Sequence, residues 1–238
     1  MASRGTDPSP WASEWRTTTL LNRLSAPVRD EMIRLGAARS YEPGDVLIRQ
    51  GGTSREALLL LSGLVKVKAE DGHTDVLLTV RGAGDVVGDL AALSGQARSA
   101  TVTAGTAVVA RFILPDTLRE FLRRHPQAAE LLNALMVDQL MQANRRRVEF
   151  ATMPVMDRLI SVILELVAIC GDRRLDGSVH LPPVFSQSEW ADLVGAASED
   201  TVQRCLRNLR SAGLVTPRYK FLVVEDPGRL RAEQGRIR

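Results

Sequence analysis

The chain has 238 residues, of which 45% are hydrophobic and 25% charged, and it carries a formal net charge of +3 with an isoelectric point of about 9.2. This length suits one or two domains with a real core, and the mildly basic charge permits nucleic-acid binding without proving it. Two cysteines and three scattered histidines exclude a disulfide scaffold and a metal-ligand array. The N-terminus lacks the apolar region of a signal peptide and the longest apolar run, 57–61, is too short for a membrane, so we expect a cytoplasmic protein.

The N-terminal part divides into a polar tail and a helical segment. Residues 1–17 are rich in Ser, Pro and charge, which predicts disorder. Helical signals follow between Trp15 and Gly36, with Pro27 at a helix start and Gly36 as a stop.

The character changes between residues 39 and 114, where short β-type runs alternate with glycine turns. Residues 65–68 alternate between apolar and polar, as a half-buried strand does, and residues 100–113 form the last run. Several short strands at close spacing predict an antiparallel barrel or roll, and we assign residues 18–125 to this domain.

A long helix is predicted from Pro126 to Met153, after a short one at 117–124. Between Ala128 and Met141 it is apolar almost all round, so it must be covered on two sides. A second copy of the same helix is the natural cover, which makes residues 126–153 a dimerisation helix; a core helix inside a monomer is the alternative. Pro154 ends the helix, and an amphipathic helix at 155–170 and a loop at 172–184 follow.

The stretch from Phe185 to Val215 has the signals of two short helices joined by a tight turn. Ser186 and Glu189 form a capping box at the first helix, and Gly195 begins a turn of small residues. Ser198 caps the second helix and Gly213 ends it. This register indicates a helix-turn-helix, although a helical hairpin with a solvated basic face remains the alternative.

The second helix carries the chemistry of DNA recognition, because the first residues of that helix enter the major groove. Five cations and no acid lie between residues 201 and 220. Arginine pairs with guanine and glutamine with adenine, and strand signals at 214–224 predict a wing that reaches phosphates. The candidate DNA-binding residues are Ser198, Glu199, Asp200, Thr201, Gln203, Arg204, Arg207, Arg218 and Lys220.

The order of β-roll, long helix and winged helix-turn-helix resembles the CRP/FNR family of bacterial transcription regulators over residues 18–225. Gly84-Asp85-Val86-Val87-Gly88-Asp89-Leu90 followed by Arg98-Ser99-Ala100-Thr101 resembles the phosphate-binding cassette of cyclic-nucleotide domains. The segment from Gly195 to Arg204 resembles the turn and recognition helix of the family. The resemblance implies an α+β fold with an antiparallel β-roll, a dimerisation helix and a winged helix-turn-helix domain at 154–238.

The resemblance also implies a small effector in the roll, either cAMP or another cyclic nucleotide. Arg98 and Ser99 would hold its phosphate, Gly88 would allow close approach, and Asp89 would accept from a ribose hydroxyl. The candidate ligand-binding residues are Gly88, Asp89, Leu90, Arg98, Ser99 and, facing the base from the long helix, Asn144.

Two departures keep a second interpretation of the roll open. Asp89 stands where nucleotide-binding members carry the longer glutamate, and Ala143 stands where they place a hydroxyl against the purine. The alternative is therefore a roll that no longer binds nucleotide, with Arg98 held by a local acid.

The partners implied by the resemblance are a palindromic operator in double-stranded DNA, a second copy of the chain, and RNA polymerase. Glu199-Asp200 replace the Arg-Glu of many members, so we expect a different operator. The sequence contains no catalytic triad, Walker loop or zinc motif, so we expect no enzyme. A constitutive DNA-binding regulator and a ligand-binding or scaffold protein without DNA binding remain as alternatives.

Overall fold

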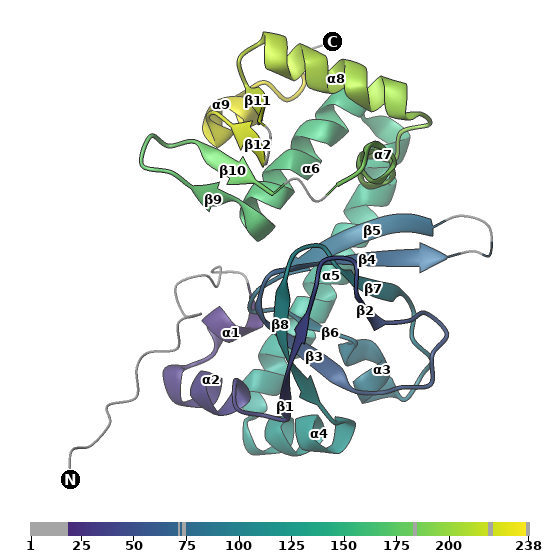
Figure 1. The fold of residues 1–238 in the computed structure, drawn as a ribbon, viewed down its shortest axis with the longest axis vertical. Helices are drawn as coiled ribbons and strands as arrows, with labels where there is room; N and C mark the ends of the chain where they lie inside the picture. The colour runs from purple at the N-terminus through teal and green to yellow at the C-terminus, as the bar shows by residue number, and fades with distance from the viewer. Residues whose placement is uncertain (1–18, 71, 73–74, 183–184, 219–220, 237–238) are drawn as a thin grey trace. The chain divides into compact units, whose positions relative to one another are not determined.

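The computed structural model describes residues 19–70, 72, 75–182, 185–218 and 221–236 (Figure 1). The predicted disorder of residues 1–17, the start of the first helical segment and the wing residue Lys220 lie outside the described residues. Contacts between Cα atoms divide the chain into unit 1, residues 1–65 and 81–135, and unit 2, residues 66–80 and 136–238.

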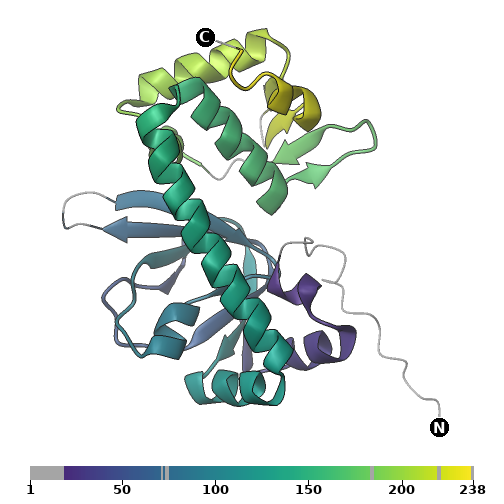
Figure 2. The same ribbon diagram turned by 180° about the vertical axis from the view of Figure 1, so that it is seen from behind.

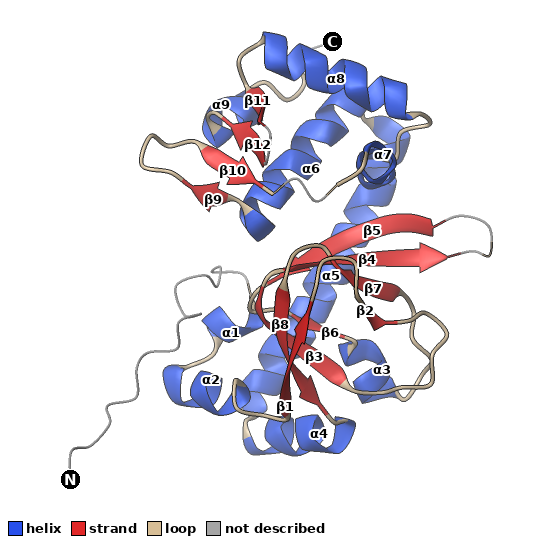
Figure 3. Ribbon diagram, viewed as in Figure 1, coloured by secondary structure: helices blue, strands red, loops and turns tan. Residues whose placement is uncertain are grey.

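Unit 1 is built around antiparallel strands, and this confirms the predicted β-roll (Figure 3). Two sheets have the strand orders β1-β8-β3-β6 and β2-β7-β4-β5. Strands β4 and β5 continue into unit 2. The strands are β1 (Ala37–Tyr41), β2 (Val46–Ile48), β3 (Ala57–Ser62), β4 (Leu64–Glu70), β5 (Asp75–Gly82), β6 (Val86–Val87), β7 (Thr101–Ala104) and β8 (Val108–Ile113).

The continuous apolar run at residues 57–61 becomes β3, which lies between β8 and β6 in its sheet. All five of these side chains are buried, because an inner strand covered on both faces needs no polar alternation. The run predicted at 100–113 is two strands, since the chain turns at Gly105, whose N–H donates to the Leu64 carbonyl at 2.8 Å.

The helices of unit 1 are α1 (Leu20–Arg23), α2 (Ala26–Met32), α3 (Asp89–Ser94) and α4 (Pro115–Arg124). The predicted helical segment before Gly36 is thus two short helices, interrupted at Leu24 and Ser25. Helix α3 lies inside the predicted cassette and was not expected from the sequence. Leu118 and Phe121 of α4 are fully buried and contribute to the core of the roll.

Helix α5 (Pro126–Thr152) is one continuous helix that runs from unit 1 into unit 2, and its predicted bounds are confirmed to within one residue (Figure 2). Only Ala128 and Leu132 of this helix are fully buried, so its other apolar side chains stay partly or largely uncovered within the protomer. No helix among the described residues is long and apolar enough to cross a membrane.

Unit 2 contains helix α6 (Val155–Cys170), and the predicted bounds of this helix are confirmed. The predicted winged helix-turn-helix follows it in the chain. Its sheet has the order β11-β12-β10-β9. The remaining elements are β9 (Asp172–Arg173), β10 (Val179–Leu181), α7 (Gln187–Val194), α8 (Glu199–Ser211), β11 (Val215–Arg218), β12 (Phe221–Val224) and α9 (Pro227–Ala232).

The prediction of a plain loop at 172–184 is wrong, because this segment contains β9 and β10. Both strands are too short for a clear pattern, yet Val179 and Leu181 are buried on either side of half-buried His180. Strand β10 pairs with β12, and the His180 ring stacks on Phe221 with centroids 4.3 Å apart. The wing hairpin β11–β12 is therefore half of a four-stranded sheet.

The turn between α7 and α8 depends on Gly195, and this generates a test of the fold. Its φ is +62°, and an added Cβ would lie 2.7–2.8 Å from ring atoms of Phe150. Gly195→Ala is expected to lower the unfolding free energy by about 2–4 kcal/mol, from left-handed strain plus overpacking. Urea unfolding followed by circular dichroism measures the loss.

Gly213→Ala is the matched control, since Gly213 has φ +65° but nothing within 4 Å of the added Cβ. It should cost only the strain of about 1–2 kcal/mol. Equal losses in the two variants would show that the Phe150 contact is unimportant.

Candidate DNA interface and effector site

The first helix of the motif, α7, begins at the predicted capping box. The Glu189 backbone N–H donates to Ser186 Oγ at 3.2 Å, and the Ser186 N–H donates to Glu189 Oε2 at 2.9 Å. Both otherwise unsatisfied donors are paired, so the start of α7 is defined by local sequence alone.

The turn that follows is held by residues from outside the motif. The Arg158 guanidinium, from α6, donates to the Gly195 carbonyl at 3.0 Å and lies 5.4 Å from the centre of the Phe150 ring. Arg158 and Phe150 thus fix the angle at which α8 leaves α7. Neither contact was predicted, because both residues are far from the turn in sequence.

Helix α8 begins as predicted at Ser198, whose Oγ accepts from the Thr201 N–H at 3.4 Å. Its buried face is Val202, Cys205 and Leu209. Burial raises the pKa of the Cys205 thiol, which stays protonated and packs as a small apolar side chain.

The opposite face of α8 is polar and open. Glu199, Asp200, Arg204 and Arg207 are exposed, whereas Thr201 and Gln203 are half-buried. Within the described part of the chain, the guanidinium groups of Arg204 and Arg207 have no hydrogen bond or ion pair. Their donors are free for an external acceptor, and guanine and phosphate are acceptors that arginine fits.

The wing presents Arg218 as an exposed side chain at the end of β11. Its position is set by the ladder with β12, in which Arg218 pairs with Phe221. At the other side of the motif, Arg229 of α9 donates to the Ala212 carbonyl at 3.1 Å and caps the end of α8. The C-terminal residues Pro227–Ala232 therefore form a short helix against the motif.

In unit 1, Arg98 is almost fully buried, with 3% of its surface exposed. Its guanidinium donates to the Gly88 carbonyl at 2.9 Å, to the Glu56 carbonyl at 2.6 Å and to Ser54 Oγ at 3.2 Å. The Glu56 carboxylate lies 3.5 Å away. A phosphate that binds Arg98 must replace some of these oxygens.

Gly88 and Asp89 stand beside this arginine at the start of α3. Gly88 has φ +75°, and an added Cβ there would lie 2.5 Å from an Arg98 nitrogen. Burial raises the pKa of the Asp89 carboxyl, while hydrogen bonds from the Asp89 and Leu90 backbone N–H groups oppose that rise. The carboxylate thus sits at the N-terminus of its own helix.

The structure brings Gly88, Asp89 and Arg98 together, whereas the neighbouring Leu90 and Ser99 are exposed. Asn144 is exposed on the part of α5 that belongs to unit 2. Sequence reasoning missed Ser54 and Glu56 as partners of Arg98. The only signal was the expectation of a local acid, which the sequence did not assign to a residue.

Two family models match the chain. The cyclic nucleotide-binding domain matches residues 38–125, and the Crp-like helix-turn-helix domain matches residues 157–233. The first contains α3 and Arg98, and the second contains α7, α8 and the wing.

Relatives match over most of the chain. A CRP-like cAMP-activated global transcriptional regulator of Mycobacterium tuberculosis is 27% identical over 192 residues, 80% of this chain and 84% of that protein. The cAMP-activated global transcriptional regulator CRP of Escherichia coli is 27% identical over 190 residues, 77% of this chain and 87% of that protein.

Solved structures share the fold. A CRP/FNR-family transcriptional regulator from Thermus thermophilus superposes with a TM-score of 0.68 at 24% identity, over 84% of this chain and 98% of that one. The c-di-GMP-responsive global regulator CLP of Xanthomonas campestris gives 0.68 at 21% identity, over 84% and 99%. With both domain models matched in order, the chain belongs to the CRP/FNR family and is a DNA-binding transcription regulator with a cyclic-nucleotide-binding-like roll.

Proposed function

We propose that this regulator binds a palindromic operator as a homodimer, with α8 in the major groove, and acts there on RNA polymerase in the cytoplasm. The observation that carries the proposal is the open polar face of α8, where Arg204 and Arg207 are exposed and unpaired among the described residues. The Crp-like family model spans this helix and supports the same role.

The proposed contacts are of two kinds: some read the bases, and others bind phosphates and position the protein on the DNA. Arg204 and Gln203 read bases, and Glu199 or Asp200 accepts from cytosine N4 while also stabilising the start of α8. Ser198, Thr201, Arg207, Arg218 and Lys220 supply phosphate contacts that set the register.

Arg204→Ala is expected to weaken binding to the cognate operator by about 1–3 kcal/mol and to weaken binding to random DNA much less. The operator is obtained by binding-site selection with the purified protein, and affinities are measured by gel shift at fixed salt. Arg210→Ala, which removes the same charge from the exposed last turn of α8, should lower both affinities alike. An equal loss on both DNAs in Arg204→Ala would reduce Arg204 to a phosphate contact.

Dimerisation is proposed along α5, which carries a stripe of exposed apolar side chains. Val137, Leu140, Met141 and Val148 are exposed to 58%, 61%, 63% and 62%. Their spacing keeps them on one helix face, and Asn144 falls within the same stripe. Two copies of this face would form a helical seam, and a polar Asn in such a seam favours one register.

Leu140→Glu is expected to give monomers in analytical ultracentrifugation, because it places an unpaired charge in the seam. Since Leu140 is exposed within the protomer, the fold itself should persist by circular dichroism. Gln142→Glu, which adds a negative charge on the opposite face of α5, is the control and should remain dimeric. Dimers in both variants would place the interface elsewhere.

We also propose that the roll takes a cyclic nucleotide, with its phosphate on Arg98 and Ser99 above Gly88 and its base near Asn144. Two relatives named as cAMP-activated and the cyclic nucleotide-binding family model support this ligand class. The buried guanidinium supplies charge-assisted donors once the Gly88 or Glu56 oxygens are displaced. Such a ligand shifts DNA binding only by its differential affinity for two arrangements.

Affinity for cAMP is expected to be roughly 10–100-fold below that of a relative with Glu at position 89 and a hydroxyl at 143, because each departure removes a hydrogen bond of about 0.5–1.5 kcal/mol. Calorimetry with cAMP, cGMP and cyclic di-GMP at millimolar concentration measures this. Ser99→Ala and Asn144→Ala, both at exposed positions, should reduce the heat further. No heat from any ligand, with tight operator binding by the untreated protein, would leave the constitutive regulator as the function.

A further inference from the structure

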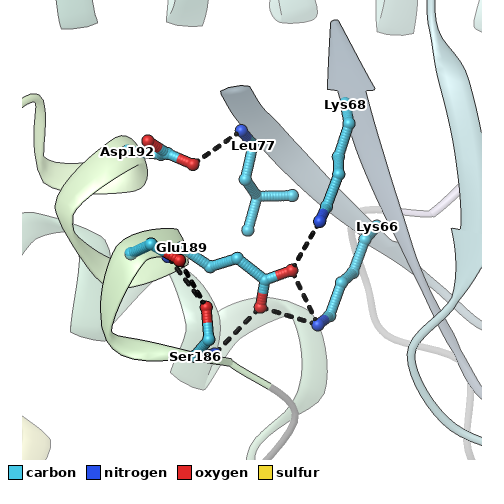
Figure 4. A network of polar contacts seen from close by, with 7 residues as sticks. Lys66, Lys68, Leu77, Ser186, Glu189 and Asp192 are labelled. Carbon is cyan, nitrogen blue, oxygen red and sulfur yellow. Dashed lines mark hydrogen bonds and ion pairs between the residues drawn. The ribbon is translucent and has the colours of Figure 1, made fainter. Parts of the chain in front are cut away.

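The outer part of the β4–β5 hairpin, residues 66–80, groups with the DNA-binding motif in unit 2. Two lysines of β4 meet one carboxylate of α7 (Figure 4). Lys66 Nζ lies 2.9 and 2.7 Å from the two carboxylate oxygens of Glu189, and Lys68 Nζ lies 2.9 Å from Glu189 Oε1. Glu189 therefore joins the capping box of the motif to the hairpin.

Glu189 is a buried charge, with 6% of its surface exposed. Burial alone would raise the pKa of its carboxyl, but hydrogen bonds from Lys66, Lys68 and the Ser186 N–H hold that pKa below the ordinary value. The carboxylate thus stays ionised at neutral pH, and these hydrogen bonds all come from groups of the protein itself. A buried charge that is well paired is costly to separate from its partners.

Other bonds hold the same hairpin. The Leu77 backbone N–H donates to Asp192 Oδ2 at 3.1 Å, one turn of α7 beyond Glu189 (Figure 4). On the α5 side, the Arg146 guanidinium donates to the Leu78 carbonyl and, at 2.7 Å, to both carboxylate oxygens of Glu165. The hairpin is thereby attached to α7 directly and to α6 through Arg146.

Of the base-reading side chains of α8, Arg204 stays exposed and Gln203 half-buried while the hairpin is docked on α7. The hairpin therefore holds the motif without covering its reading face. We propose that Lys66, Lys68 and Glu189 form a positioning latch, which keeps the helix-turn-helix in its operator-binding arrangement. The inference rests on the DNA-binding role of α8 proposed above and adds how that motif is held.

A simple charge effect gives a different expectation from a latch. Removing the negative charge of Glu189 should strengthen attraction to DNA, whereas removing the lysines should weaken it. A latch predicts weaker operator binding in both cases. Either change frees the motif and so lowers the fraction of molecules in the operator-binding arrangement. The two explanations therefore disagree on the effect of Glu189→Gln.

Glu189→Gln is the decisive variant, because glutamine keeps the capping box with Ser186 and loses only the charge. We expect about three- to thirtyfold weaker operator binding by fluorescence anisotropy, with an unchanged salt slope. The Lys66→Met/Lys68→Met variant should show a similar loss, and the triple variant should lose no more than either. The triple variant, Lys66→Met/Lys68→Met/Glu189→Gln, leaves no unpaired buried charge. Its operator binding can therefore test the latch if the Lys66→Met/Lys68→Met variant does not fold.

Glu225→Gln is the matched control, since it removes the same charge from an exposed position in the same unit. Its operator affinity should stay equal or rise slightly. Amine labelling reads the latch directly, because the chain has only three lysines, Lys66, Lys68 and Lys220. Acylation of Lys66 and Lys68, normalised to Lys220 and followed by mass spectrometry, should accelerate in Glu189→Gln.

Equal or tighter operator binding by Glu189→Gln would overturn the latch, as would unchanged labelling of Lys66 and Lys68. Additive losses in the triple variant would also overturn it. If the wild-type protein bound no DNA sequence in the selection, the DNA-binding role would fail at that earlier step. The labelling experiment would still report whether the lysines are held by Glu189, so the two failures are distinguishable.

Discussion

The DNA-binding motif depends on the close packing of the Phe150 ring against Gly195. Only a residue without Cβ leaves room for the ring and accepts the left-handed turn at the same time. Arg158 adds a hydrogen bond to the Gly195 carbonyl, so the end of α5 and the start of α6 both bear on the turn. The direction in which α8 presents Arg204 follows from these contacts, which lie outside the motif itself.

The roll contains a second constraint, in which a buried guanidinium is satisfied by the protein's own oxygens. Arg98 bonds to Gly88, Glu56 and Ser54, so it stabilises the loop before α3 even without a ligand. A cyclic phosphate and these oxygens compete for the same donors. Ligand affinity is then a difference between two sets of charge-assisted bonds, and small changes near Glu56 would tune it.

Local signals predicted most of the fold. The capping box at Ser186, the Ser198 cap and the proline-bounded helix α5 were readable because each depends on neighbours in sequence. The two-residue strand β9 and its partner β10 were missed, since β10 forms by pairing with β12 and β9 by pairing with β10, which periodicity cannot show.

The sequence predicted the candidate site residues themselves but not the residues that hold them in place. The exposed polar residues of α8 followed from the helix-turn-helix pattern, and the cassette residues Gly88, Asp89 and Arg98 followed from the resemblance to cyclic-nucleotide domains. Their supports did not, because contacts such as Phe150 with Gly195 or Lys66 with Glu189 join residues far apart in the chain. Alternation at 65–68 predicted a half-buried strand but not that its lysines meet one buried carboxylate.

The division of the chain has a consequence for modularity. The DNA-binding unit is discontinuous, since residues 66–80 belong to it although they lie between two segments of the roll. A chimera that joined only residues 136–238 to another sensor would leave Glu189 without its lysines and Asp192 without the Leu77 amide. A working chimera of this protein is therefore expected to carry residues 66–80 together with residues 136–238.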